Sequence, residues 1–534
     1  MSTARGPLVW WLFLTLLGLS VAPALAGWED DLDALLSAPE GPEQKALLKS
    51  VLSAEPGWRD VARAIETTTF PEPSAAGQTV LLTTVCADGV ERPWVLFVPA
   101  GYDPAARTPL LVALHGGVSG PDLIDDPMEY VAENEFKGLA EAAGWIAVFP
   151  LGQEGATWWD DVGMENIRSL VRTVKRGYNV DDDRVWMIGF SDGASAGFLH
   201  AMLVPDDYAA FVCLNGHMGV GSLDGELPTY ATNMAETPIY AVTTHDDGLY
   251  PSARMRPTIE MALRAGGDIL YRELPGTHDF DYAEDEIPRI RRFLERHVRD
   301  ALPSRLTWEA AERRFGRRGW IAIDRVTVGA AAPWHREHNC GMVDDRVTIG
   351  FHPDYDFEGE GVLVGSVVEG EHPAYEMGLL AGDVIVAGNG EKIVDIEELD
   401  GFKGTLSRGD AFEITVLRNG DRVDLIGELP EAENYLVFQR TAPSGMVRAR
   451  YAANVIDVKT SRVGALRVFV HPDLVALDQN VVVRVDGEVV YDDVVAPDVA
   501  YMLKGFLENR DRRLLYVGEI EIEVPERNRV SRGR

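Results

Sequence analysis

The stretch Gly189-Phe190-Ser191-Asp192-Gly193 decides the fold of this chain. It follows the apolar run Val185-Trp186-Met187-Ile188 and opens a helix of small residues that begins at Ala194. A nucleophilic serine on a sharp turn from strand to helix has unusual backbone angles, so its neighbours must lack bulk, and the helix N-terminus points to where an oxyanion develops. The same glycine pattern also occurs in structural turns. Its place between a strand and a helix predicts that Ser191 is a nucleophile.

Serine is a weak nucleophile without a base, so a carboxylate and then a histidine should follow it in the chain. Two strand-like runs downstream, residues 239–242 and 270–274, each end in a polar loop. The first loop contains Asp246 and Asp247, and the second contains His278. Both loops lie at the carboxyl edge of the predicted sheet, where ligands bind in open α/β folds. We predict that His278 is the base and Asp247 its orienting acid; Asp246 is the rival acid, and a solvated turn is the alternative for both carboxylates.

A second glycine turn lies upstream, where the apolar run 111–114 leads into His115-Gly116-Gly117. The backbone N–H of Gly117 is expected to pair with that of Asp192 to form an oxyanion hole. A lone histidine in such a turn is more often a structural hydrogen-bonding residue than a catalyst, and we interpret His115 in that way.

Two adjacent tryptophans, Trp158 and Trp159, lie on the loop after the run 145–149, at the same edge of the predicted sheet. Because neighbouring side chains do not easily point the same way, one of them is expected to line the acyl or leaving-group pocket. Packing of both in the core is the alternative.

Short apolar runs alternate with helical patterns from residue 73 to residue 302. This alternation predicts an α/β domain with a mostly parallel sheet and helices on both faces. The expected strands are Val80–Val85, Trp94–Val98, Leu110–Leu114, Trp145–Phe149, Val185–Gly189, Ala210–Leu214, Ile239–Val242 and Ile269–Leu274. The expected helices lie at about 130–143, 163–177, 194–203, 257–265 and 284–298.

With these motifs, residues 78–300 resemble the α/β-hydrolase fold in its compact secreted esterase branch. That branch includes polyhydroxyalkanoate depolymerases, feruloyl and acetylxylan esterases, and peptidase-like members related to prolyl oligopeptidases. The resemblance implies a Ser191–His278–Asp247 triad and an acyl-enzyme mechanism. The segment Leu214–Pro238 is too short for a lid domain, so an open cleft is expected.

Residues 343–430 carry a second set of motifs, with Gly378-Leu379, Gly382-Asp383 and Asn389-Gly390 in series. This region resembles a PDZ domain of the bacterial kind along its whole length. The resemblance implies that Thr348-Ile349-Gly350-Phe351 forms the loop whose N–H groups hold the C-terminal carboxylate of a peptide, beside a strand edge that accepts the peptide. The alternative is a degenerate module that only packs on the hydrolase.

Residues 27–72 contain no motif of a catalytic or binding site. Residues 27–72 are expected to form a solvated helical hairpin, and residues 303–342 a β-rich connecting segment. Residues 431–534 are expected to form a β-rich domain with a hairpin around Asp486-Gly487 and a basic tail. Whether the PDZ unit interrupts one β-rich domain made of both segments stays open.

The first 26 residues predict export. Arg5 precedes an uncharged apolar run, and Ala24-Leu25-Ala26 has the small-x-small form that signal peptidase recognises, so cleavage is expected after Ala26. The mature chain is then secreted or periplasmic, and an uncleaved signal that anchors it in the membrane is the alternative.

Composition narrows the classes of function. The 534 residues are 46% hydrophobic with a net charge of −35, which excludes a mostly disordered chain and makes nucleic acid an unexpected partner. Three cysteines, Cys86, Cys213 and Cys340, allow at most one disulfide. We expect no cofactor and no metal, and we interpret the acidic run Asp181-Asp182-Asp183 as solvated rather than as a calcium site.

Three functions follow from these patterns. The favoured one is an exported serine hydrolase that acts on carboxylic esters and uses its PDZ module to bind a peptide or partner. The second is an exported serine peptidase to which the PDZ module presents protein C-termini. The third is a binding protein without catalysis, which the complete set of Ser191, Asp247 and His278 disfavours.

Overall fold

The computed structural model describes residues 27–72, 75–120, 124–370, 372–438, 440 and 442–524. The predicted export signal, residues 1–26, and the predicted basic tail lie outside the described residues. The chain divides into two compact units, residues 1–68 and 69–534. Among the described residues, no helix has both the length and the apolar character needed to span a bilayer.

The first unit contains three helices, α1 (Trp28–Ser37), α2 (Pro42–Ser53) and α3 (Trp58–Glu66). α1 and α2 pack against each other, which is the hairpin that the sequence predicted, and α3 adds a further helix. Pro42 stands at the first position of α2, where the missing backbone N–H costs nothing.

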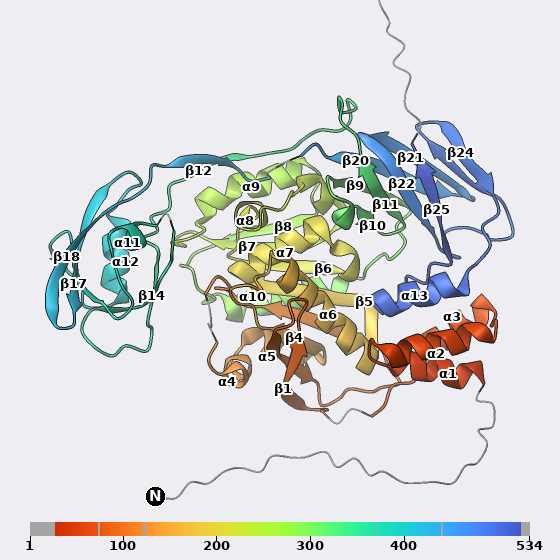
Figure 1. Ribbon diagram of the computed structural model, residues 1–534, viewed down its shortest axis with the longest axis horizontal. Coiled ribbons are helices and arrows are strands. Elements are labelled where there is room, and N and C mark those ends of the chain that lie inside the picture. Colours follow the sequence, from red (N-terminus) through yellow and green to blue (C-terminus); the bar gives the residue numbers. More distant parts are fainter. Residues whose placement is uncertain are drawn as a thin grey trace, which may run out of the picture. The chain divides into compact units, whose positions relative to one another are not determined.

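The second unit begins with an eight-stranded sheet in the order β1-β2-β4-β3-β5-β6-β7-β8 (Figure 1). β2 runs antiparallel to both of its neighbours, β1 and β4, and the pairs from β4 through β8 are parallel. This confirms the predicted α/β fold with a mostly parallel sheet. The strands are β1 (Gln78–Val85), β2 (Glu91–Val98), β3 (Thr108–Leu114), β4 (Ile146–Pro150), β5 (Val180–Phe190), β6 (Ala210–Leu214), β7 (Ile239–Thr244) and β8 (Ile269–Leu274).

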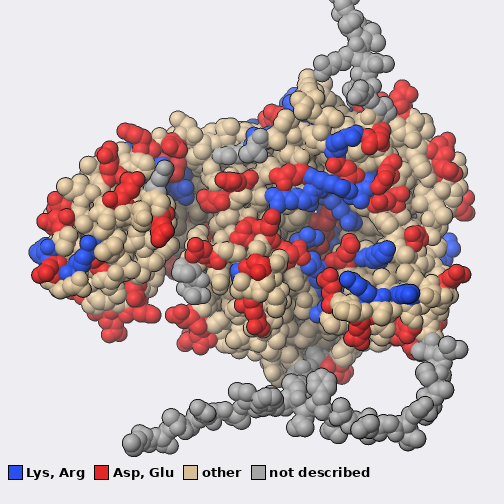
Figure 2. Space-filling model, in the orientation of Figure 1, with Lys and Arg blue, Asp and Glu red and all other residues tan. Residues whose placement is uncertain are grey.

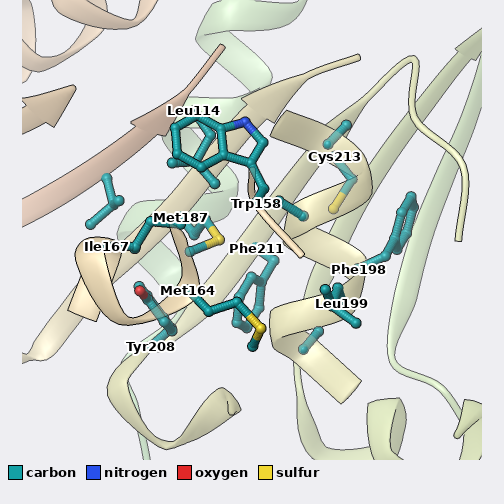
Figure 3. Close-up of a cluster of buried hydrophobic side chains, with 14 of the residues drawn as sticks. Leu114, Trp158, Met164, Ile167, Met187, Phe198, Leu199, Tyr208, Phe211 and Cys213 are labelled. Atoms are coloured by element: carbon teal, nitrogen blue, oxygen red, sulfur yellow. The ribbon is translucent and has the colours of Figure 1, made fainter. Parts of the chain in front are cut away.

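Two hydrophobic cores cover the two faces of this sheet. One core contains residues of α6 (Asp161–Gly177), α7 (Asp192–Leu203) and α9 (Ser252–Arg264), and the other contains residues of α4 (Pro127–Ala132), α5 (Glu135–Ala143) and α10 (Ala283–Arg296). Figure 3 shows part of the first core, which contains Met164 and Ile167 of α6 and Phe198 and Leu199 of α7. The central strands are apolar on both faces because helices bury both.

The PDZ region folds as a six-stranded sheet with two short helices. Its main path is β13-β14-β15-β17-β18, with β16 paired to β15, so that β13 is an edge strand. The elements are β13 (Phe351–Pro353), β14 (Val362–Val367), α11 (Pro373–Glu376), β15 (Val384–Gly388), β16 (Glu391–Lys392), α12 (Ile396–Gly404), β17 (Ala411–Arg418) and β18 (Asp421–Glu428). A two-stranded ribbon, β12 (Gly341–Asp344) with β19 (Glu433–Leu436), brackets the PDZ region in the chain.

The segments on either side of the PDZ region pair with each other in two sheets. One has the order β10-β11-β22-β25 and the other β24-β23-β21-β20-β9. The elements are β9 (Arg305–Ala310), β10 (Arg317–Arg318), β11 (Ile321–Val326), β20 (Gly445–Ala452), β21 (Val455–Ser461), β22 (Val463–Val470), β23 (Val481–Val485), β24 (Glu488–Asp493), α13 (Val499–Asn509) and β25 (Gly518–Glu523). The segments 303–342 and 431–534 therefore contribute strands to the same sheets, and the PDZ region is inserted between them.

A buried ion network ties the C-terminal segment to the α/β domain. Asp182 of β5 pairs with Lys175 at 3.0 Å and with Arg512 at 2.8 Å, and Asp511 pairs with Arg299 at 2.6 Å. The side chains of Asp182 and Asp511 are 1% and 0% exposed, so the interpretation of the run 181–183 as solvated is wrong for Asp182. Here the carboxylate is buried because cations from distant segments neutralise it.

The excess of acidic residues is visible at the surface. Asp and Glu are spread over the face drawn in Figure 2, and Lys and Arg gather on part of it. All three cysteines are free thiols in the structure, with Cys86 and Cys213 buried.

We predict that Asp511→Asn lowers the free energy of unfolding by about 3 kcal/mol, because Lys175 and Arg299 lose the buried carboxylate that they share and keep only Asp182 and Asp183. Burial alone would raise the pKa of Asp511, but the charges of Arg299 and Lys175 outweigh burial and lower it. The contribution is therefore present at neutral pH and lost as the pH falls toward that lowered pKa. Urea unfolding of both proteins at pH 7 and at acid pH measures the difference.

The control is Asp161→Asn, which removes an exposed carboxylate paired with Arg314. Such a pair contributes about 1 kcal/mol or less. Equal losses for the two variants would show that the buried network does not stabilise this fold.

Candidate active site

Ser191 stands at the turn between β5 and α7 in a backbone conformation that L-residues rarely adopt, with φ 56° and ψ −118°. The backbone N–H of Ser191 donates to the carbonyl of Leu214 at the end of β6, which fixes the turn against the neighbouring strand. The hydroxyl lies at the carboxyl edge of the sheet, and the residue retains 9% of its surface exposed. The structure therefore gives Ser191 the strained position that the sequence predicted.

The glycines around Ser191 are required by close approach. A Cβ on Gly189 would lie 2.2 Å from the backbone of Gly193, and a Cβ on Gly193 would lie 2.2 Å from the carbonyl oxygen of Leu114. A Cβ on Gly116 would lie 2.8 Å from the Cβ of Ser191 itself. Any side chain at these positions would displace the turn, since real Cβ atoms do not approach so closely.

Ser191, His278 and Asp247 form one hydrogen-bonded row. Nε2 of His278 lies 2.9 Å from Oγ of Ser191, and Nδ1 of His278 lies 2.8 Å from Oδ2 of Asp247. His278 follows β8 and Asp247 follows β7, as expected for loops at one edge of a parallel sheet. Asp246, the rival carboxylate, is exposed to solvent.

Asp247 is held as a carboxylate by its hydrogen bonds. Oδ1 accepts from the backbone N–H groups of Leu249 and Tyr250 at 2.8 and 2.7 Å, and Oδ2 accepts from Asn215 Nδ2 at 2.9 Å as well as from His278. Burial opposes ionisation, but the bonds from His278, Tyr250 and Asn215 outweigh it and lower the pKa of Asp247. The ionised acid can thus hold Nδ1–H of His278 and leave Nε2 to face Ser191.

The sequence reasoning missed the residues that support this acid. Asn215 directly follows β6 with φ 53°, and its side-chain amide also donates to Thr244 Oγ1 at 2.6 Å. The hydroxyl of Tyr282 donates to Oδ1 of Asn215. Asn215 lies after a strand at the carboxyl edge, so the rule that placed Asp247 could have selected it, whereas Tyr282 has no such signal in the sequence.

The upstream glycine turn packs against the nucleophile turn. Gly117 has φ 68°, and the backbone N–H of Val118 donates to Oδ2 of Asp192 at 2.9 Å. Burial raises the pKa of Asp192, although contacts with the backbone of Val118 and Gly117 oppose this shift. The side chain of Asp192 therefore holds the turn containing Gly117 beside Ser191, where the predicted oxyanion hole would form.

His115 and the two tryptophans are structural in this arrangement. Nδ1 of His115 donates to the carbonyl of Gly116, Nε2 accepts from the N–H of Gly152, and burial lowers the pKa of His115 to about 4. Trp158 is fully buried among apolar side chains (Figure 3). Its indole N–H donates to the carbonyl of His115. Trp159 is 6% exposed and belongs to the same core. Both tryptophans thus pack in the core, which was the alternative to a role in the substrate pocket.

The loop Thr348-Ile349-Gly350-Phe351 leads into the edge strand β13. Gly350 has φ 94°, and a Cβ there would lie 2.5 Å from the Cβ of His372, so glycine is required. The carbonyls of Ile349 and Gly350 accept from the backbone of Ala374 and Val368. These bonds turn the carbonyls into the domain, beside a free strand edge that a peptide could extend.

Comparison with known proteins finds the PDZ domain family at residues 342–426. The chain is 42% identical over 102 residues to a probable periplasmic serine endoprotease, DegP-like, of Hahella chejuensis; the match covers 18% of this chain and 21% of that protein.

The chain is also 29% identical over 166 residues to the bifunctional acetylxylan esterase/xylanase XynS20E of Neocallimastix patriciarum. This match covers 30% of this chain and 22% of that protein, so the chain spans about a fifth of the length of these curated relatives.

Among solved structures, the fluorophosphonate-binding serine hydrolase F of Staphylococcus aureus is 16% identical, with a TM-score of 0.34, over 40% of this chain and 97% of that one. The strand order and the similarity to the esterase identify residues 78–300 as an esterase-like α/β-hydrolase domain. The family match identifies residues 342–426 as a PDZ domain.

Proposed function

We propose that this protein is a serine hydrolase that cleaves carboxylic esters through an acyl-enzyme on Ser191. One observation carries the proposal: His278 lies within hydrogen-bonding distance of both Ser191 Oγ, at 2.9 Å, and Asp247 Oδ2, at 2.8 Å. A nucleophile, a base and an orienting acid in this order and geometry activate serine for attack on a carbonyl carbon.

The residues of the site have separate roles in the proposed reaction, and His278 serves as both base and acid. Oγ of Ser191 attacks the ester carbonyl while Nε2 of His278 takes its proton, and the N–H groups of Gly117 and Asp192 receive the developing oxyanion. When the tetrahedral intermediate collapses, His278 returns the proton to the departing alcohol and the acyl group stays on Ser191. Water then attacks the acyl carbon with His278 again as base, and this step releases the carboxylic acid.

An ester is the favoured substrate because the similarity to an acetylxylan esterase supports it. A peptide is the second candidate, since the same three residues can cleave an amide and the PDZ domain supplies a place to hold a protein C-terminus. The segment between β6 and β7 carries only α8 (Val220–Leu223) and the short 3-10 helix η2 (Ala231–Glu236), which is consistent with a hydrolase that has no lid domain.

The proposal includes export. The apolar run before Ala26 has the form of a cleaved signal, which would place the mature protein in the periplasm or outside the cell.

Ser191→Ala should abolish turnover of p-nitrophenyl esters, because the substitution removes the only group that forms the acyl bond, and should leave thermal stability nearly unchanged. Ester hydrolysis by the purified variant measures this. The exposed Ser304→Ala is the matched control and should turn over esters as the wild type does. Substantial turnover by Ser191→Ala would rule out the proposed nucleophile.

Asp247→Asn should reduce kcat/KM by up to about 10⁴-fold, as loss of the orienting carboxylate does in the best-studied triad. Asp246→Asn removes the same charge one residue away, at an exposed position, and should change kcat/KM less than about twofold. Steady-state kinetics on one ester compare the two variants. A larger loss for Asp246→Asn would mean that the acid has been assigned to the wrong residue.

The PDZ loop should bind free C-terminal carboxylates through the N–H groups of Thr348–Phe351. We expect the full-length protein to bind members of a decapeptide library with free C-termini, and affinity should fall at least about tenfold when a hit is amidated, because a charge-assisted hydrogen bond is lost. Fluorescence titration with each hit and its amidated twin measures the difference. Equal affinities, or no binding by any peptide, would make the module a structural spacer and remove the main support for a peptidase.

A further inference from the structure

We propose that Tyr435, on the ribbon that carries the PDZ domain, is a positioning residue for the nucleophile Ser191, and that PDZ occupancy thereby adjusts turnover. The inference rests on the proposed function. Two sets of contacts carry it: a hydrogen-bond chain from Tyr435 to the backbone of Ser191 and a row of aromatic rings from Tyr435 to His278.

The first link of the hydrogen-bond chain joins Tyr435 to His217, which is 4% exposed. Nδ1 of His217 accepts from the N–H of Gly219 at 2.7 Å, so the proton of the neutral ring lies on Nε2, 3.0 Å from the hydroxyl oxygen of Tyr435. Burial lowers the pKa of His217 to about 3, so the ring stays neutral across the working range. The hydroxyl of Tyr435 then donates to the sulfur of Met342 at 3.6 Å. Each hydrogen bond of His217 and Tyr435 therefore has a defined donor and acceptor.

The chain continues into the nucleophile turn. The backbone N–H of His217 donates to Oγ of Ser195 at 3.0 Å, and Oγ of Ser195 donates to the carbonyl oxygen of Ser191 at 3.3 Å. Ser195 is 2% exposed and lies in the first turn of α7. The position of His217 is therefore coupled to the backbone of the strained residue that carries the nucleophile.

A second route uses ring contacts. The ring of Tyr435 lies 6.1 Å from that of His217, His217 lies 5.8 Å from Tyr250, and Tyr250 lies 5.8 Å from His278. The backbone N–H of Tyr250 also donates to Asp247. A shift of Tyr435 would thus reach the base and its acid as well as the nucleophile.

The ribbon connects this chain to the PDZ domain. Met342 of β12 pairs with Tyr435 of β19, and the carboxylate loop begins only four residues after β12 ends at Asp344. Arg408 of the PDZ domain reaches Asp344 at 3.6 Å. At its other end the ribbon is anchored to the hydrolase, since Oγ of Ser222 in α8 donates to the carbonyl of Val437 at 2.7 Å. A ligand that moves the loop acts directly on the strands that hold Tyr435.

Tyr435→Phe tests the positioning role because it removes one oxygen and keeps the ring. We expect kcat for a p-nitrophenyl ester to fall by roughly 3- to 10-fold with KM within about twofold, since the loss acts on the reacting geometry rather than on ground-state binding. The matched control is Tyr451→Phe, which removes a hydroxyl bonded to the carbonyl of Leu302 outside the site and should leave both constants unchanged.

A double-mutant cycle separates coupling from general destabilisation. Ser195→Ala cuts the same chain at its other end, so the double variant with Tyr435→Phe should be no slower than the slower single variant. Multiplicative losses, or a Tyr435→Phe enzyme with wild-type kcat, would overturn the positioning role.

Peptide addition tests the link to the PDZ domain. The tightest free-carboxylate decapeptide from the library should change the kcat of the wild type at least twofold, its amidated twin should not, and Tyr435→Phe should not respond. No response by the wild type, or an equal response by Tyr435→Phe, would overturn the link. If the wild type neither turns over esters nor labels at Ser191, the proposed function fails and the inference with it.

Discussion

The turn at Ser191 is the constraint on which the rest of the site depends. Its backbone angles cost about 1–3 kcal/mol, and the surrounding structure must enforce them. Gly189, Gly193 and Gly116 permit the close approach of three chain segments, and the bond from Ser191 N–H to Leu214 ties the turn to the next strand. In the proposed function the strain has a chemical use, because it raises the hydroxyl above the sheet edge and directs the first turn of α7 toward the carbonyl oxygen of an ester.

The parallel sheet then determines the positions of the proposed acid and base. Strands β7 and β8 end beside β6, so their loops bring Asp247 and His278 to the serine, while Asn215 and two backbone N–H groups keep the carboxylate ionised in a buried position. The PDZ domain is connected to these contacts, since the ribbon that carries it places the Tyr435 hydroxyl beside His217, and we propose that this contact positions Ser191. An inserted module whose two ends form one ribbon can transmit a change at its ligand loop through a short, buried path.

Local sequence signals were sufficient to locate the strands, the turn at Ser191, the loops that carry Asp247 and His278, and the PDZ domain, since each depends on short-range patterns or on the shared edge of a parallel sheet. Contacts between distant segments were not predictable. The sequence around Asp182 predicts a solvated acid, because its partner Arg512 lies far away in the chain. The residues around Tyr435 likewise give no sign of its hydrogen bond to His217. The strands before and after the PDZ region pair across more than one hundred residues, so the insertion was left open. One of Trp158 and Trp159 was expected to line a pocket because their loop lies at the reactive edge, but the indole N–H of Trp158 is bonded inside the core.

The central claim is that Ser191 is the activated nucleophile of this chain. The most direct measurement is reaction of the folded protein with a fluorophosphonate, followed by mass spectrometry of the intact chain and of its peptides. We expect one adduct per chain, on the peptide that contains Ser191, and loss of the adduct when the protein is unfolded before the probe is added, because only the folded site places His278 2.9 Å from the hydroxyl. An adduct on another serine, or no adduct on the folded protein, would contradict it.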